Sequence, residues 1–202
     1  PSFPIAVACD PAFNFVYEAN IRYLHHLGEV TYFSPLADTS LPDAGFVYLP
    51  GGYPELYLAA LSANRQMLQS IRRYVESGGK LLAECGGMMY LCDEIRDKNG
   101  YVYPMAGVLH QSATMENMKL RLGYRTLLYN ETRLKGHEFH YSRLVEQQNP
   151  LPSCAVAYTA KGVETDTPLY HYKNVWAGYT HLYWADPVGN EWFTKFVIDG
   201  NT

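Results

Sequence analysis

The sequence predicts an α/β domain with a mostly parallel central sheet that is flanked by helices. In the first half of the chain, short apolar runs alternate with segments whose apolar residues recur at helical spacing, and this alternation is typical of βαβ units. Hydrophobic residues make up 48% of the 202 residues and charged residues 18%, so the chain can bury a core of its own. Because no repeat, low-complexity tract or linker divides it, we predict a single domain over residues 1–202.

Local patterns predict the elements of the first half. Apolar, β-prone runs indicate strands at residues 5–8, 30–33, 46–49 and 80–84. A first helix over residues 17–27 should end at Gly28. The clearest helix has Asn64 as its N-cap and Gly78-Gly79 at its end. Its buried face should consist of Met67, Leu68, Ile71 and Val75.

The second half of the chain has a different texture. Short runs rich in Tyr and Thr, broken by Gly and Pro, predict additional strands that extend or cover the sheet. These strands are expected at residues 120–129, 138–145, 155–159 and 175–183. A last helix is expected over about residues 190–198, with Trp192 and Phe196 on its apolar stripe.

Composition and charge exclude several classes of function. The net charge is -4 and the 16 Lys and Arg residues form no basic stripe, so we expect no nucleic-acid partner. No apolar run approaches the roughly 18 to 20 residues of a membrane span, and the start lacks a signal peptide. The four cysteines have neither CxxC spacing nor any other zinc-site spacing. We therefore expect a cytoplasmic protein with reduced thiols, no membrane association and no metal site.

The segment KLLAECGGMM, residues 80–89, carries the strongest chemical signal. An apolar strand, then Cys85, two glycines and a helical run through Ile95 form a nucleophile elbow. Such a turn exposes its nucleophile, and the N-terminus of the following helix should lower the pKa of the thiol. Cys92 is expected further along the same helix as a core residue. The alternative for Cys85 is an inert buried thiol.

Two further segments can complete a site around this cysteine. Gly51-Gly52 follows another apolar strand, so Gly52 can offer a backbone N–H to an oxyanion opposite the N–H of Gly86. A simple turn is the alternative. His181, at the end of the apolar run 175–183, can lie beside the elbow and serve as its base, or can be an ordinary core histidine.

Five motifs in order resemble the carboxyl-terminal glutaminase domain of the cobyrinate a,c-diamide synthase family. They are IAVACDPAFNFVY, LPGGYPELY, LLAECGGMMYL, GHEFHYS and GYTHLYW, and together they cover nearly the whole chain. The resemblance implies a class I glutamine amidotransferase fold of flavodoxin-like type. It also implies that Cys85 is the nucleophile, that His181 activates it, and that Gly52 and Gly86 form the oxyanion hole.

The sequence departs from the wider superfamily at one position. Class I amidotransferases typically carry His-x-Glu, but Tyr183 stands two residues after His181, so the acid of the triad is missing. Glu138 and His140 of the GHEFHYS motif are candidates for glutamine binding or for support of the dyad, with ordinary satisfied polar residues as the alternative. Arg121 is a candidate partner for the α-carboxylate of glutamine.

The resemblance also implies what lies outside this chain. The implied reaction is glutamine hydrolysis that supplies ammonia for amidation of the a and c carboxylates of cobyrinate in corrinoid synthesis. No G-x-x-x-x-G-K-[ST] motif is present, so ATP and Mg²⁺ are expected to bind an amino-terminal synthase domain, and no cofactor is expected here. The intact enzyme can be a homodimer. Cobyric acid synthase or another tetrapyrrole amidase, a different cysteine hydrolase, and a non-catalytic docking domain remain alternatives.

Overall fold

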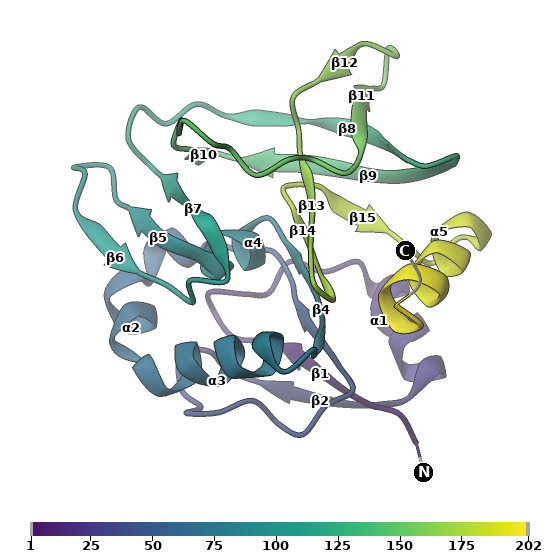
Figure 1. The fold of residues 1–202 in the computed structure, drawn as a ribbon, viewed down its shortest axis with the longest axis horizontal. Helices are drawn as coiled ribbons and strands as arrows, with labels where there is room; N and C mark the ends of the chain where they lie inside the picture. The colour runs from purple at the N-terminus through teal and green to yellow at the C-terminus, as the bar shows by residue number, and fades with distance from the viewer. Residues whose placement is uncertain (1, 201–202) are drawn as a thin grey trace.

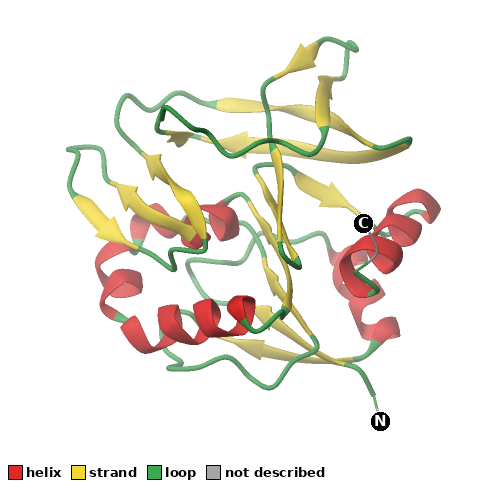
Figure 2. Ribbon diagram, viewed as in Figure 1, coloured by secondary structure: helices red, strands yellow, loops and turns green. Residues whose placement is uncertain are grey.

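A six-stranded sheet forms the centre of the computed structural model, which describes residues 2–200 (Figure 1; Figure 2). Its strand order is β13-β14-β4-β3-β1-β2. All neighbouring strands are parallel except β13, which pairs antiparallel with β14 at one edge. The predicted α/β class is therefore confirmed. The strands are β1 (Pro4–Ala8), β2 (Glu29–Phe33), β3 (Phe46–Leu49), β4 (Lys80–Glu84), β13 (Leu169–Tyr172) and β14 (Val175–Gly178).

Helices cover both faces of this sheet. Alternate residues of each strand point to opposite faces, so one strand contributes to two separate cores. Ala6 and Ala8 of β1 belong to a core that also contains residues of α2, α3 and α4. Ile5 and Val7 belong to a second core with residues of α1, α5 and the π-helical turn that follows α5. The helices are α1 (Glu18–Leu27), α2 (Leu58–Ala63), α3 (Arg65–Glu76), α4 (Gly86–Leu91), α5 (Pro187–Trp192) and the π-helical turn Phe193–Ile198, with a short 3-10 turn at Pro54–Leu56.

Two smaller sheets are added by the second half of the chain. One has the order β10-β7-β5-β6 and the other β12-β11-β8-β9-β15. Figure 1 shows the long β8 and β9 strands running across one end of the central sheet. The strands are β5 (Cys92–Arg96), β6 (Val102–Pro104), β7 (Leu109–Thr114), β8 (Arg121–Tyr129), β9 (Thr132–His140), β10 (Arg143–Leu144), β11 (Val156–Thr159), β12 (Glu164–Thr165) and β15 (His181–Tyr183).

The structure confirms most predicted elements and corrects four. The predicted strand 138–145 is divided between the end of β9 and the short β10, which belong to different sheets. The helix after the elbow ends at Leu91 instead of reaching Ile95, and Cys92 begins β5, because this segment pairs with β7. The predicted strand 175–183 is divided into β14 in the central sheet and β15 in the five-stranded sheet. The last helix begins at Pro187, where the Asp186 carboxylate accepts a hydrogen bond from Gly189 N at 2.7 Å.

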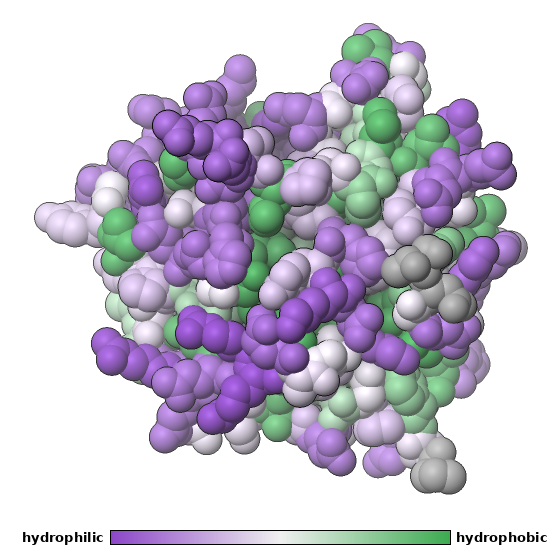
Figure 3. Space-filling model, viewed as in Figure 1, coloured by the Kyte–Doolittle hydropathy of each residue, from purple (hydrophilic) through white to green (hydrophobic). Residues whose placement is uncertain are grey.

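The clearest predicted helix, α3, is confirmed in detail. Its N-cap is Asn64, whose side-chain oxygen accepts a hydrogen bond from Met67 N at 3.4 Å. The predicted apolar face is buried in full. No helix within residues 2–200 is both long and apolar enough to cross a membrane. On the face seen in Figure 3, hydrophilic residues predominate and hydrophobic residues are scattered among them.

Buried side chains hold the free edge of β15. The Asn20 amide donates to Leu182 O at 2.8 Å and accepts from Trp184 N at 3.0 Å. The Glu84 carboxylate accepts from Leu182 N at 2.6 Å and from the Trp184 indole at 3.3 Å. Burial has the larger effect on the pKa of Glu84 and raises it to about 8, although the N–H donors act to lower it. Two side chains thus take the place of a neighbouring strand.

We expect Asn20→Leu to destabilise the fold by about 2 to 5 kcal/mol, because it leaves Leu182 O in β15 and Trp184 N just after it without partners. Urea unfolding followed by circular dichroism measures the change. His25→Ala, on the exposed face of the same helix, should stay within about 0.5 kcal/mol of the unaltered protein. Equal stability of the two variants would show that Asn20 does not hold β15.

Candidate active site

Cys85 lies at a sharp turn between β4 and α4. Its backbone has φ 52° and ψ -109°, a conformation that costs a non-glycine residue about 1 to 3 kcal/mol and that clusters at functional sites. The following residue has no room for a side chain, since a Cβ on Gly86 would lie 2.7 Å from Pro54 Cδ and 3.2 Å from Gly52 O. The predicted elbow is present, with the Gly51-Gly52 loop directly against it.

The two candidate oxyanion donors, Gly52 and Gly86, therefore lie close together. Gly51 O accepts a hydrogen bond from Phe15 N at 3.1 Å, which fixes the loop. Within residues 2–200, the N–H of Gly52 donates to no protein acceptor. The N–H of Gly86 is directed at the Cys85 thiol. Both groups are free of competing secondary-structure bonds and can donate to an oxyanion.

His181 and Cys85 line the same small pocket although they come from different sheets. The pocket holds about 20 Å³ and is also lined by Phe15, Gly52, Tyr53 and Phe139. Each of the two candidate catalytic side chains is only 4% exposed. A space of this size holds about one water molecule. This space is smaller than a glutamine side chain, and Phe15 and Tyr53, which border it, are each about two-fifths exposed.

Electrostatics favour an uncharged pair in this closed pocket. Burial, with a smaller contribution from Glu55, raises the pKa of the Cys85 thiol well above its usual range, and the Gly86 N–H only partly opposes it. Burial, then the nearby His137 and His140, lowers the pKa of His181 to about 3. The expectation that the elbow helix lowers the thiol pKa is wrong for this closed state, because desolvation outweighs the field of a six-residue helix.

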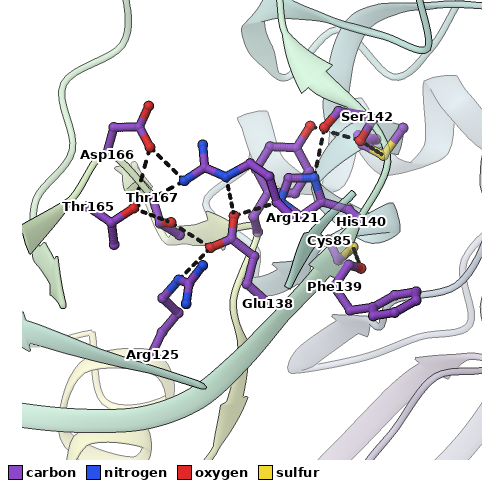
Figure 4. Close-up of polar contacts among 12 residues, drawn as sticks. Cys85, Arg121, Arg125, Glu138, Phe139, His140, Ser142, Thr165, Asp166 and Thr167 are labelled. Carbon is purple, nitrogen blue, oxygen red and sulfur yellow. Dashed lines mark hydrogen bonds and ion pairs between the residues drawn. The ribbon is translucent and has the colours of Figure 1, made fainter. Parts of the chain in front are cut away.

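A buried ionic cluster lies on the other face of β9 (Figure 4). Glu138 is its centre and accepts from Arg125 Nε at 2.7 Å, from the Thr167 hydroxyl at 2.6 Å and from His140 Nε2 at 2.6 Å. Burial raises the pKa of Glu138, but the bonds from His140 and Thr167 outweigh it and lower the pKa to about 2. The other His140 nitrogen donates to Ser142 O at 2.8 Å. Both ring nitrogens of His140 are therefore occupied within the cluster.

Arg121 joins this cluster from β8. Its Nη2 donates to Asp166 at 2.7 Å and to Thr165 at 3.1 Å, and its Nε lies 3.6 Å from Glu138 Oε1. Arg121, Glu138 and His140 line a separate cavity of about 690 Å³. The structure thus brings these three predicted residues together, but not into the Cys85 pocket. Their link to it is Phe139, whose carbonyl oxygen accepts from Cys85 Sγ at 3.6 Å.

Several residues at the pocket were not singled out by the sequence analysis. Phe15 packs edge-on against the His181 ring, with ring centroids 4.6 Å apart. His137 stacks on the same ring at 5.0 Å. The alternation of side chains in GHEFHYS places His137 and Phe139 on one face of a strand. No sequence pattern near either segment indicates that His181 pairs opposite His137. Within the described part of the chain, no group of three His, Cys, Asp or Glu side chains is arranged to hold a metal ion.

Glu138→Gln should lower stability by about 3 to 5 kcal/mol at pH 7, because it leaves buried cationic partners without their carboxylate. The Glu138 pKa is depressed in the folded state, so its contribution is present above its unfolded pKa near 4.5 and is lost as pH falls towards about 2. Urea unfolding between pH 7 and pH 3 should show the gap between variant and unaltered protein shrinking below pH 4.5. Glu164→Gln, on exposed β12, is the control, and a gap that stays constant would contradict the assignment.

Comparison with known proteins places the chain among glutamine amidotransferases. Residues 4–188 match the CobB/CobQ-like glutamine amidotransferase domain. The hydrogenobyrinate a,c-diamide synthase of Pseudomonas aeruginosa is 40% identical over 185 residues, which are 89% of this chain and 41% of that protein. The cobyrinate a,c-diamide synthase of Clostridium acetobutylicum is 39% identical over 204 residues, 96% of this chain and 45% of that protein. The chain therefore spans less than half the length of these relatives.

Solved structures support the fold assignment. The structure of PurLQS from Thermotoga maritima matches with a TM-score of 0.60 at 18% identity and covers 90% of this chain and 88% of that one. A crystal structure of a glutamine amidotransferase matches with a TM-score of 0.58 at 17% identity and covers 96% of this chain and 98% of that one. At these identities the likeness concerns the fold, and it agrees with the fold class implied by the sequence resemblance.

The family match extends over most of the chain. Three motifs that carried the resemblance, which contain Gly52, Cys85 and His181, meet at one pocket. The chain belongs to the family of CobB/CobQ-like glutamine amidotransferase domains.

Proposed function

We propose that this chain hydrolyses glutamine to glutamate and ammonia, with Cys85 as nucleophile and His181 as its base. The ammonia serves an ATP-dependent synthase that amidates the a and c carboxylates of cobyrinate or hydrogenobyrinate. The observation that carries this proposal is the shared pocket, in which an elbow cysteine, a histidine from another sheet and the Gly52 loop meet. The names of the relatives that are 39–40% identical support the choice of acceptor.

The first half of the proposed reaction uses the groups that line or adjoin the pocket. His181 is neutral at pH 7, because its pKa is lowered to about 3, and can accept the proton of the Cys85 thiol. The sulfur then attacks the carboxamide carbon of glutamine, and the N–H groups of Gly52 and Gly86 bind the oxygen that becomes negative. Collapse of this intermediate breaks the C–N bond, and His181 returns its proton to the leaving nitrogen. The products are ammonia and a γ-glutamyl thioester on Cys85.

The second half uses the same groups in reverse. His181 takes a proton from a water molecule, which attacks the thioester carbonyl while its oxygen again lies between Gly52 and Gly86. Cleavage of the C–S bond releases glutamate and returns the proton to the Cys85 sulfur. Since the resting pocket holds only about 20 Å³, turnover also requires that Phe15 and Tyr53 move aside. A partner that shifts these two side chains can therefore control the rate of glutamine hydrolysis.

The ionic cluster supports the site in this proposal. Glu138 and His140 use their hydrogen-bonding groups within the cluster, so we assign them to holding β9 and the Phe139 carbonyl beside Cys85. Arg121 is 37% exposed beside the separate 690 Å³ cavity, so it can bind the α-carboxylate of a glutamine that extends from Cys85 into that cavity.

The synthase is assigned to a part of the protein outside these 202 residues, and ATP and Mg²⁺ to that part. The relatives are more than twice as long as the matched region. Exposed apolar side chains gather at the pocket: Phe15 and Tyr53 line it, Leu122 and Tyr124 pair opposite Phe139 and His137, and Tyr141 packs on Phe139. Each of these five residues is at least 39% exposed. Exposed apolar patches of this kind mark interaction sites. We propose that the synthase docks here, close to where ammonia is released.

Cys85→Ser should lower glutamine hydrolysis at least 10³-fold, because a serine hydroxyl is a far weaker nucleophile beside a neutral imidazole. Amidation of the corrinoid acid by the intact protein should continue when free ammonium replaces glutamine. Glutamate release and corrinoid amide formation measure the two steps.

Cys9→Ser, at an exposed thiol, is the matched control and should leave both steps unchanged. Glutamine-driven amidation that survives Cys85→Ser would exclude Cys85 as the nucleophile. Cleavage of peptides without any hydrolysis of glutamine would instead favour a cysteine peptidase of the same fold.

A further inference from the structure

The orientation of His181 needs an explanation, because no acid holds its ring. In the described residues 2–200, neither ring nitrogen of His181 accepts or donates a hydrogen bond to a protein group, and the residue two positions later is Tyr183. A catalytic imidazole that rotates freely loses much of its effect, since a misplacement of about 1 Å can cost roughly 10²-fold in rate. The ring must therefore be fixed by other contacts.

Three neighbours confine the His181 ring by packing. His137 stacks on one face, with ring centroids 5.0 Å apart and planes inclined by 21°. Phe15 meets the ring edge-on at 4.6 Å. Gly51 closes another side so tightly that a Cβ there would clash with His181 Cε1, and it would lie 3.0 Å from Nδ1. The imidazole thus occupies a slot that fits a flat ring in one orientation.

His137 is itself held in place from two directions. The pairing of β9 with β15 puts His137 directly opposite His181. The hydroxyl of Tyr17 bonds to His137 Nδ1 at 2.6 Å and lies 3.5 Å from His181 O. Tyr17 in turn packs edge-on against Tyr183, with ring centroids 5.6 Å apart and planes at 85°. A chain of contacts therefore runs from the position of the missing acid through Tyr17 and His137 to His181.

We propose that His137, fixed by the Tyr17 hydroxyl, is a positioning residue that orients His181 by ring stacking and so replaces the acid of the triad. This inference rests on the proposed glutaminase function. The stack restrains the ring as a carboxylate would, but it offers no negative charge to stabilise an imidazolium. It therefore aligns His181 to take the proton of the Cys85 thiol as the sulfur attacks an electrophile, without holding a thiolate at rest.

The test uses the intact protein and asks whether His137 acts by stacking on His181 or only by stabilising the fold. His137→Ala removes the stack and should lower kcat for glutamine hydrolysis roughly 10- to 100-fold with little change in KM. His137→Phe keeps a flat ring in the slot but loses the bond to the Tyr17 hydroxyl, so it should restore kcat in part, to a value above that of His137→Ala. The matched control is His171→Ala, since His171 stacks on Trp176 at 4.0 Å in β13, away from the pocket. It should leave kcat unchanged.

A double-mutant cycle with His181→Ala shows whether His137 acts through His181. If it does, adding His137→Ala to His181→Ala has no further effect on kcat. The rate of Cys85 alkylation by iodoacetamide, followed by mass spectrometry of the peptide that contains Cys85, gives the same cycle without substrate. His137→Ala and His181→Ala should each slow this alkylation, and the double variant should be no slower than His181→Ala.

Three results would overturn the proposal: a kcat for His137→Ala equal to that of His171→Ala, a His137→Phe variant as slow as His137→Ala, or effects that multiply in the cycle. Failure of the glutaminase assignment is separate. In that case the unaltered protein releases no glutamate with its synthase present, while the alkylation cycle still reports whether His137 positions His181.

Discussion

A buried carboxylate joins the two strands that carry the proposed nucleophile and base. Glu84, the residue before Cys85, accepts a hydrogen bond at 2.6 Å from the backbone of Leu182, the residue after His181. Asn20 holds the same strand from α1. Water cannot compete for these bonds, since Glu84 and Asn20 are each 1% exposed. The relative position of the two side chains is therefore set by their immediate neighbours in the chain.

Strand β9 separates two environments by the simple alternation of its side chains. Glu138 and His140 face the ionic cluster, where charges neutralise one another, whereas His137 and Phe139 face the pocket. Because one backbone carries both sets, the cluster can hold the pocket wall without placing a full charge beside the thiol. The Phe139 carbonyl, 3.6 Å from Cys85 Sγ, is the point where the two meet.

Without substrate, the pocket keeps Cys85 in an unreactive form. Burial raises the Cys85 pKa and lowers that of His181, so the pair is uncharged. The space between them is too small for glutamine. A thiol that remains protonated in a closed pocket is also protected from adventitious oxidation and alkylation. These properties fit the proposed release of ammonia, which is useful only when an acceptor is ready.

The sequence by itself determined the elements whose signals are local. The strands β1 to β4, the capped helix α3 and the elbow at Cys85 depend on apolar periodicity, caps and glycines, which act within a few residues. The family motifs likewise identified Cys85, His181, Gly52 and Gly86, and these residues do meet at one pocket or along its wall. The place of β5 was not predicted, because pairing with β7 overrode the helical pattern after Leu91.

Only the tertiary structure decided how the site is held and charged. His137 reaches His181 through the antiparallel register of β9 with β15, and Glu84 reaches Leu182 across two sheets. Neither contact can be predicted from the spacing of residues within either segment. The direction of the thiol pKa was predicted wrongly for the same reason, because the helix dipole is a local property whereas desolvation depends on everything that packs around Cys85. The sequence indicates the proposed reacting groups, and the packing of distant segments sets their orientation and charge.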